Sequence, residues 1–499
     1  MLKLNGRELF LDDRILNTEL TTATMLAHKP TPRELVLELN NPWEGDLCGY
    51  PSIIADDGVI RLYYRGYRTG SKEWTVCYAE SKDGIRFEKP DLGIYKRFGS
   101  GRNNIILAEG MIEDINQIDN IYFFKDTNPD CPPSERYKAV LGWEGHGWLI
   151  SLYSEDAINW RRGADITNKG AFDSQNIVFY DNEKKKYVCY CRGESANTSG
   201  VPMIDKSLPD AVGLKFYDKE RIALDYPKEH EKYYMRSVIR LESEDFKEWS
   251  DPVEISFPQD EPRFQLYTNG IKPYPGVEGL YVGIATRYVE RKEWNEAFDE
   301  LCDRENRLVR IKTQAPRSGL AITDSILIAT RDGVNFITSG ESFVDGGVER
   351  DGGWVYGDCF FAPGFIETQS EYPSADKEYS VYCLEDYRSF KHTSLRRYRM
   401  RRDGFVSLHA PSKARAVVTK EFILEGNRLL ANLSTSARGY LKFKLVSEGE
   451  EYESCEYFGN SVNKNIVFRG IDISKLSGKV CRLEIELFEA DLYSIEFTK

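Results

Sequence analysis

The sequence predicts an all-β fold in which a five-bladed β-propeller is followed by a small C-terminal β-sandwich. Three observations lead to this prediction. One short turn motif recurs five times at wide spacing, strand-like segments precede each copy, and the pattern changes after about residue 411. We therefore expect two domains, the propeller over residues 1–410 and the sandwich over residues 411–499.

The recurring motif places an aspartate in a turn between a strand-like run and an aromatic residue. Successive aspartates are roughly 70 to 90 residues apart, which is long for a helical repeat but fits the four strands and loops of one propeller blade. The fifth copy is weaker than the others. The copies are SKDGIRF (81–87), SEDAINW (154–160), SEDFKEW (243–249), TRDGVNF (330–336) and RRDGFVS (401–407).

The chemistry of tight turns explains the motif. Serine and aspartate side chains accept hydrogen bonds from nearby backbone N–H groups, and glycine tolerates a positive φ. We expect the aromatic residue after each turn to begin the next strand and to pack between blades. A single copy would also fit an ordinary hairpin, but five ordered copies favour a repeat.

Before each turn the sequence contains two alternating or apolar runs, which we interpret as the first two strands of a blade. These pairs are YPSIIAD with IRLYYRGY, IDNIYFFKD with RYKAVLGWE, QNIVFYD with KYVCYCRGE, LYTNGIKPY with LYVGIATRY, and VYGDCFFAPGF with EYSVYCLEDY. Two insertions interrupt the rhythm: a polar stretch at 201–235 and a partly helical one at 289–316. Both could shape a pocket over one end of the propeller, or both could be decorative surface loops.

After residue 411 short alternating strands are separated by turns, as in KEFILEG, YLKFKLVSEG and VCRLEIELFEA. This pattern is typical of a small antiparallel sandwich. The segment carries no obvious chemistry, and we expect it to pack on the propeller and stabilise it.

Composition limits the partners. The net charge is −13 without a long basic run, which argues against nucleic acid. The N-terminus lacks a signal pattern and no apolar run is long enough to cross a membrane, so we expect a cytoplasmic protein without a membrane partner. Ten scattered cysteines and five histidines predict buried thiols such as Cys189 and Cys191, and no metal site or other cofactor. A central Ca²⁺ would suit an oxygen-rich channel, but no loop has a recognisable ligand spacing. The oligomeric state stays open.

In a propeller, the first strands begin and the second strands end around one mouth of the central channel, so functional residues should recur there in each blade. The first-strand starts carry Asp46, Tyr50, Asp119, Asn120, Asp173, Gln175, Tyr267, Asn269, Tyr356 and Asp358. The second-strand ends carry Arg65, Arg192, Glu194, Arg287, Glu385 and Arg388. So many polar groups in a core need a purpose, because an unpaired buried polar group costs free energy.

An acidic funnel lined by aromatic residues suits a hydroxyl-rich ligand, and two facing carboxyl groups are the minimum for glycoside hydrolysis. Structural roles are open at each position. Asp173, Asp46 and Asp119 could shape turns or loops, and Asp358 could cap a loop. Glu194 could pair with Arg192 or Arg287. Asp12 and Asp13 would reach the channel if the N-terminal strand closed the last blade.

Several segments together resemble a group of bacterial proteins described as related to glycoside hydrolase families 32, 43, 62 and 68. The segments are LFLDDRIL, NPWEG with YPSII, KDTNPDCPPSERYKAV, GAFDSQNIVFYD, LYTNGI, VYGD and RRDGFVSLHA. The resemblance covers nearly the whole chain and implies a five-bladed propeller that acts on furanosides and related glycans.

By blade position, the resemblance transfers the blade-two aspartate of those hydrolases to Asp119 and the blade-three acid to Asp173. The blade-one aspartate does not transfer, because Tyr50-Pro51 stands where those enzymes have Asp-Pro. Asp46 is the nearby carboxylate. The blade-three glutamate is also replaced by a shorter aspartate, unless Glu194 takes that role.

We therefore expect a glycoside hydrolase that acts on short oligosaccharides. Asp173 or Glu194 would be the general acid, Asp358 or Asp46 the base or nucleophile, and Asp119 would orient the sugar or tune a pKa. The expected substrate-binding residues are Arg65, Tyr50, Gln175, Arg192, Tyr267, Asn269, Arg287, Tyr356 and Glu385. The alternatives are a glycoside phosphorylase with phosphate held by Arg65, Arg192 and Arg287, and a catalytically inactive carbohydrate-binding propeller.

Overall fold

The computed structural model describes most of the 499 residues. Outside the described part lie residues 1, 72, 116, 143–146, 196–221, 223–234, 259–264, 292, 390 and 499. Most of the predicted insertion at 201–235 falls in these ranges. Among the described residues, no helix combines the length and the apolar character that crossing a membrane requires.

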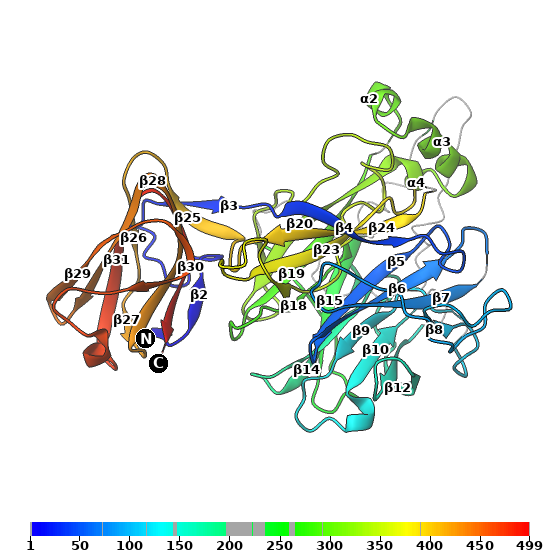
Figure 1. Ribbon diagram of the computed structural model, residues 1–499, viewed down its shortest axis with the longest axis horizontal. Coiled ribbons are helices and arrows are strands. Elements are labelled where there is room, and N and C mark those ends of the chain that lie inside the picture. Colours follow the sequence, from blue (N-terminus) through cyan, green and yellow to red (C-terminus); the bar gives the residue numbers. More distant parts are fainter. Residues whose placement is uncertain are drawn as a thin grey trace.

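Five four- or five-stranded sheets form the blades of a propeller, which confirms the predicted fold class. Figure 1 shows them grouped at one end of the molecule, with a separate β-domain at the other. Blade one contains β5 (Gly49–Asp56), β6 (Val59–Tyr67), β7 (Trp74–Ser81) and β8 (Ile105–Ala108). Blade two contains β9 (Tyr122–Lys125), β10 (Tyr137–Leu141), β11 (Leu149–Ser154) and β12 (Arg161–Thr167), with a short 3₁₀ turn at Pro133–Glu135.

The other three blades follow the same inner-to-outer order, and all five are antiparallel. Blade three contains β13 (Ile177–Asp181), β14 (Lys186–Ser195), β15 (Met235–Ser243) and β16 (Val253–Glu254). Blade four contains β17 (Gln265–Thr268), β18 (Lys272–Pro273), β19 (Tyr281–Glu290), β20 (Ala321–Thr330) and β21 (Ile337–Thr338). Blade five contains β22 (Ile366–Thr368), β23 (Glu378–Glu385) and β24 (Thr393–Met400), and its outer strand is β4 (Thr31–Leu39).

Strand β4 comes from the N-terminal part of the chain and closes the ring by pairing with β24. The closing strand therefore lies after Asp12 and Asp13, and does not carry them to the channel. Asp13 is exposed, and Asp12 accepts a hydrogen bond from Arg331 Nε at 2.9 Å. Arg331 belongs to the blade-four turn, so Asp12 helps to join the N-terminal segment to that blade.

Four copies of the turn motif have the predicted hydrogen bonds. In the first, Ser81 Oγ accepts from the N–H of Gly84 at 2.9 Å, and Asp83 Oδ1 accepts from the two N–H groups that follow, at 2.8 and 2.9 Å. The copies at Asp156, Asp245 and Asp332 repeat this pattern. The residue after the aspartate has a positive φ in each copy, and two copies use Gly84 and Gly333 there.

The same turns hold neighbouring blades together. A tyrosine of the preceding blade donates a hydrogen bond to the turn carbonyl: Tyr63 to Ala157 at 3.1 Å, Tyr190 to Gly333 at 2.7 Å, and Tyr382 to Gly84 at 2.7 Å. The aromatic residues after these turns, Trp160, Phe336 and Phe87, make edge contacts with the same tyrosines. The prediction that these aromatic residues pack between blades is confirmed.

The fifth copy of the motif has a different role. Asp403 is itself the residue with positive φ, and its buried carboxylate accepts from Tyr274 at 2.9 Å, Ser494 at 2.8 Å and Arg7 at 3.2 Å. Tyr274 belongs to blade four, whereas Arg7 and Ser494 lie in the second domain. Asp403 therefore joins the two domains.

The second domain is one ten-stranded sheet wrapped around its own apolar core. Its long strands β28 (Arg428–Ser447) and β31 (Val480–Thr498) pair with each other over most of their length. The remaining members are β1 (Leu2–Leu4), β2 (Arg7–Leu9), β3 (Thr24–Ala27), β25 (Val406–Ala410), β26 (Arg415–Val418), β27 (Phe422–Leu424), β29 (Glu450–Tyr457) and β30 (Asn460–Ile466), with a 3₁₀ turn at Ile473–Leu476. The pairing departs from the expected division at residue 410, because β1, β2, β3 and β25 join this sheet instead of a blade. Both termini consequently lie in this domain (Figure 1).

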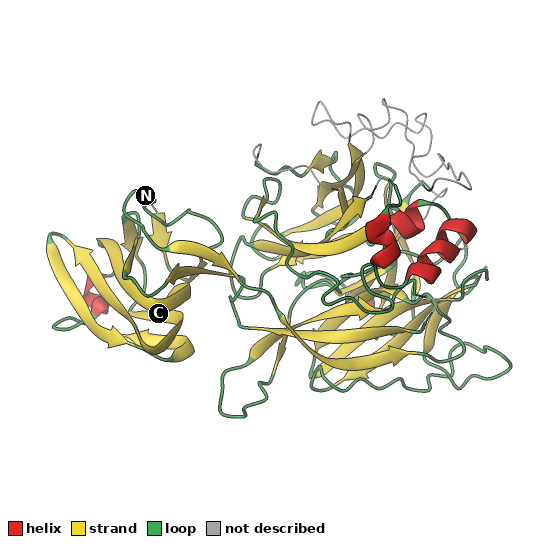
Figure 2. Ribbon diagram, turned by 90° about the horizontal axis from the view of Figure 1, so that it is seen from above, coloured by secondary structure: helices red, strands yellow, loops and turns green. Residues whose placement is uncertain are grey.

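The blade-four insertion is helical, as predicted. It contains α2 (Glu296–Glu300), α3 (Arg304–Thr313) and α4 (Arg317–Leu320), which lie together at one side of the propeller in Figure 2. Cys189 and Cys191 are buried free thiols, also as predicted.

We expect Asp403→Ala to destabilise the protein by about 3 kcal/mol, because it removes the acceptor of two buried hydroxyl groups and the partner of Arg7. Equilibrium unfolding in urea measures this change. Asp245→Ala is the control, because that turn aspartate is exposed and its loss should cost about 1 kcal/mol or less. Equal losses in the two variants would contradict a joining role for Asp403.

Candidate active site

The starts of the inner strands meet at one mouth of the propeller. One residue from each blade lies there: Tyr50, Asp119, Asp173, Tyr267 and Tyr356. Contacts among them and the surrounding arginines link all five blades. We call this group and the arginines Arg65, Arg192, Arg317 and Arg388 the funnel cluster.

Arg65, at the end of β6, connects three blades. Its guanidinium pairs with Asp119 of blade two and donates to the Tyr387 hydroxyl of blade five at 2.9 Å and to the carbonyl of Leu47 at 3.1 Å. The guanidinium carbon also lies 4.9 Å from the centre of the Tyr50 ring. Ion pairing and ring stacking together compensate for the cost of burying this charge.

Arg192, in β14, makes the matching connection on the opposite side of the funnel. It donates to the carbonyl of Tyr267 at 2.9 Å, and its guanidinium carbon lies 4.7 Å from the Tyr267 ring centre. Its nearest nitrogen is 3.7 Å from a carboxylate oxygen of Asp173. Each of the two funnel carboxylates therefore has its own arginine.

The two carboxylates differ in environment. The side chain of Asp119 is 18% exposed, whereas that of Asp173 is 49% exposed. Burial raises the pKa of Asp119, and the negative charge of Asp173 adds to this shift, while Arg65 opposes it. The funnel thus contains one carboxyl group that is biased toward its protonated form beside another that is open to solvent.

A third part of the funnel surrounds Tyr356, in the loop before β22. Its ring centre lies 5.4 Å from those of Tyr267 and Tyr288. The guanidinium carbons of Arg388 and Arg317 lie 4.5 and 5.4 Å from the ring centre. Arg388 follows β23, and Arg317 begins α4 in the helical insertion, so the insertion contributes to the site and is not merely decorative.

Two expected site residues have their amides occupied by the protein itself. The buried Gln175 donates to the carbonyls of Tyr50 and Pro51 at 3.0 and 3.2 Å. Asn269 donates to the carbonyl of Tyr190 at 3.2 Å and accepts from the N–H of Ile271 at 3.1 Å. These amides connect inner strands, which gives both residues a structural role.

Four further residues that were expected at the site form hydrogen bonds or ion pairs with other parts of the protein. Asp46 accepts from the N–H of Thr69 at 2.7 Å and shapes that loop. Glu385 accepts from Arg396 at 2.6 Å. Arg287 donates to both carboxylate oxygens of Asp324 and to the carbonyl of Gly340. Its neighbour Tyr288 reaches the funnel instead, because successive strand residues point to opposite faces.

Asp358 is the fourth of these residues. Its carboxylate accepts from the N–H of Val355 at 3.1 Å and caps the loop that carries Tyr356. Burial raises its pKa to about 7. The structure therefore favours the capping role, which the sequence left open, over that of a catalytic base.

Glu194 lies in β14, but its side chain is outside the described part of the chain.

Four funnel residues were missed from the expected site: Arg236, Tyr288, Arg317 and Tyr387. The guanidinium carbon of Arg236 lies 4.5 Å from the Tyr288 ring centre. The position of Tyr387 just after the second strand of blade five was a usable signal. The position of Arg317 was not, because it depends on how the insertion folds back over the mouth.

In the ranges that the structure describes, no group of three or more His, Cys, Asp or Glu side chains is arranged to hold a metal ion.

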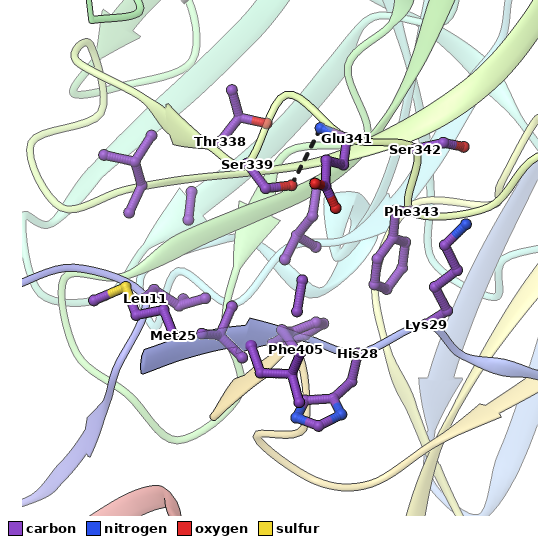
Figure 3. A pocket seen from close by; sticks show the side chains of 16 residues that line it. Leu11, Met25, His28, Lys29, Thr338, Ser339, Glu341, Ser342, Phe343 and Phe405 are labelled. Carbon is purple, nitrogen blue, oxygen red and sulfur yellow. Dashed lines mark hydrogen bonds between the residues drawn. The ribbon is translucent and has the colours of Figure 1, made fainter. Parts of the chain in front are cut away.

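A pocket of about 450 Å³ lies away from the funnel, between blade four and the second domain. Figure 3 shows its lining, which combines Leu11, Met25, Phe343 and Phe405 with the polar His28. A cavity of about 550 Å³ lies beside α2.

Comparison with known proteins gives structural similarities alone. No protein-family profile matches the chain, and no curated protein matches it in sequence. Among solved structures, it is similar to a glycosyl hydrolase from Bacteroides ovatus (11% identity, 74% of this chain and 93% of that chain, TM-score 0.41). It is also similar to an N-acetylgalactosamine deacetylase from F. plautii (11%, 75% and 94%, 0.42) and to a family 43 arabinoxylan arabinofuranohydrolase from Bacillus subtilis (9%, 94% and 99%, 0.38).

Their identities to this chain are 9–11%, and each TM-score is below 0.5. The strand pairing of this chain establishes its propeller fold.

The raised pKa of Asp358 predicts a specific dependence of stability on pH. The folded protein retains this proton up to about pH 7, whereas the unfolded chain loses it near the ordinary value of 3.8. Wild type should therefore lose stability relative to Asp358→Asn as the pH rises from about 4 to about 7, by at most about 4 kcal/mol. Urea unfolding at a series of pH values measures the difference, and parallel curves would contradict it.

Asp332→Asn is a control of opposite sign. Although burial opposes the shift, hydrogen bonds from Asn335 and Val334 lower the pKa of Asp332 to about 2. Its contribution to stability is present above the ordinary pKa and is lost as the pH falls through about 2. Wild type should therefore be more stable than this variant by a constant amount between pH 5 and 8, and the difference should shrink as the pH falls from about 4 to about 2.

Proposed function

We propose that the protein is a glycoside hydrolase whose reaction takes place in the funnel, with Asp119 as proton donor and Asp173 as the second carboxylate. One observation carries the proposal: two carboxyl groups from neighbouring blades share the funnel in opposite environments. Glycosidases need such a pair, in which one group is protonated and the other ionised.

The proposed roles follow from the surroundings of each group. Asp119, whose pKa is raised by burial, would protonate the oxygen of the leaving sugar. Asp173, which is open to solvent beside Arg192, would activate a water molecule or attack the sugar itself. A carboxyl separation of about 5–5.5 Å in the complex would favour retention of configuration, and about 6.5–9.5 Å inversion.

These roles revise the expectation from the sequence, which gave Asp173 or Glu194 the role of acid and Asp119 that of an orienting group. Asp46 and Asp358 leave the proposal because their oxygens are engaged in loops. Tyr50 and Tyr267 are 6% and 7% exposed, so a small edge of each ring would contact a sugar. A cytoplasmic location and short oligosaccharide substrates remain predictions from the sequence.

Two other functions each have an observation in their favour. The concentration of arginines around the funnel favours a glycoside phosphorylase, in which phosphate replaces water as the nucleophile. The presence of Tyr50-Pro51 in place of a blade-one aspartate favours a propeller that binds glycans without cleaving them. The same experiment separates all three.

Turnover should be measured on a panel of aryl furanosides and aryl pyranosides, with and without phosphate. We expect Asp119→Asn and Asp173→Asn each to lower kcat about 10²- to 10⁴-fold, because each removes a group that transfers a proton or stabilises the sugar cation. Asp46→Asn is the matched control, because its carboxylate shapes a loop, and it should retain nearly full activity.

Full activity of Asp119→Asn and Asp173→Asn would contradict the proposal. Turnover that requires phosphate would identify a phosphorylase. Glycan binding by wild type without turnover on a panel that includes the bound glycan would identify a binding propeller.

A further inference from the structure

Arg317 and Arg388 approach the ring of Tyr356 without a carboxylate partner. Their guanidinium carbons lie 5.4 and 4.5 Å from the ring centre. Among the described residues, neither arginine has an acidic side chain within ion-pair distance. Although burial opposes the shift, a side-chain hydrogen bond with Tyr288 helps to raise the pKa of Arg317. Arg317 Nη1 and Arg388 Nε are buried atoms without a hydrogen-bond partner in this part of the chain.

Three arginines that are more deeply buried are paired with carboxylates, whereas Arg317 and Arg388 are partly exposed, so an anion from solvent can reach them. Arg65 pairs with Asp119, Arg397 with Glu378 at 3.1 Å, and Arg310 with Asp303 at 2.9 Å. Burying a charge without a partner is costly, and stacking on a ring recovers only a part of that cost. The contrast therefore indicates that the missing negative charge around Tyr356 is supplied by a ligand.

Tyr356 itself points to the same conclusion. It is 1% exposed, and its hydroxyl, which Tyr267 approaches as a donor, itself donates to no acceptor in the ranges that the structure describes. Burial would raise the pKa of this phenol, but Arg317 and Arg388 outweigh that effect, and the net shift is downward. The local potential is therefore strongly positive, and the hydroxyl is available as a donor.

We propose that Arg317, Arg388 and Tyr356 form a subsite for an oxyanion at the funnel mouth. The oxyanion is either the carboxylate of an acidic sugar or free phosphate. Guanidinium groups match both because their N–H donors fit two oxygens at once, and the phenol would donate to a third position. The assignment deepens the proposed function, on which it rests for its placement beside Asp119 and Asp173.

The helical insertion of blade four builds this subsite. Arg317 begins α4, and Arg307 of α3 donates to the carbonyls of Trp354 and Gly353 at 2.6 and 3.3 Å. Those carbonyls belong to the loop that carries Tyr356. The insertion therefore both supplies one arginine and fixes the loop, so it determines which anion the funnel selects.

Isothermal titration calorimetry with three probes tests the subsite without depending on turnover. The probes are D-glucuronate, inorganic phosphate and D-glucose, each titrated into wild type, Arg317→Gln, Arg388→Gln and Arg102→Gln. We expect wild type to bind at least one of the two anions more tightly than glucose. Both funnel substitutions should weaken that binding at least tenfold, whereas exposed Arg102 should be neutral.

Tighter binding of glucuronate would identify the acidic sugar as the source of the oxyanion, and tighter binding of phosphate would identify free phosphate. Equal weak binding of all three probes, or anion binding unchanged by Arg317→Gln and Arg388→Gln, would overturn the subsite. If either variant fails to fold, the corresponding lysine variant, which keeps the charge but loses the two-pronged donor, should still weaken binding.

The outcome is distinguishable from failure of the proposed function. Hydrolysis of neutral aryl glycosides without anion binding would overturn the subsite and leave the hydrolase standing. Anion binding without turnover of any glycoside would support the subsite and count against the hydrolase.

Discussion

The funnel depends on the burial of one guanidinium, that of Arg65. It comes from blade one, pairs with Asp119 of blade two and hydrogen-bonds Tyr387 of blade five, and it stacks on Tyr50. A charge in this position is tolerated only while all these partners are in place. It therefore fixes the relative positions of three inner strands and holds Asp119 at the mouth, where burial raises the pKa of Asp119 and Arg65 opposes that rise.

Ring closure provides the frame for that interaction. Strand β4 completes blade five, so backbone hydrogen bonds hold the N-terminal segment that leads into blade one against the last blade. Tyrosine hydroxyls donate to the carbonyls of the serine–aspartate turns and so join neighbouring blades. Asp403 joins the propeller to the second domain by accepting from Tyr274 and Ser494. These contacts lie away from the mouth, which leaves the inner strand starts free to carry charged and aromatic side chains.

Much of the propeller and of the funnel could be predicted from the sequence, because each blade is specified by local sequence patterns. The turn copies, the strand pairs and the convergence of Tyr50, Asp119, Asp173, Tyr267 and Tyr356 all follow from position within a repeat. The errors have physical causes. Arg287 was chosen where Tyr288 faces the funnel, since a shift of one residue reverses the face of a strand.

Other parts of the site lay beyond local patterns. Whether a polar residue binds a ligand or the protein itself depends on its partners, which for Gln175 are carbonyls more than 100 residues away in the sequence. The place of Arg317 in the funnel depends on the tertiary packing of an insertion. The assignment of β1, β2, β3 and β25 to the second domain likewise depends on pairing between the two ends of the chain.

The funnel cluster is the proposed place where the ligand binds and reacts. The most direct measurement is a crystal structure of Asp119→Asn with an oligosaccharide that wild type turns over or binds. We expect sugar density between Tyr50 and Tyr267, with the glycosidic oxygen next to residue 119. Sugar density confined to the pocket between blade four and the second domain, with an empty funnel, would contradict it.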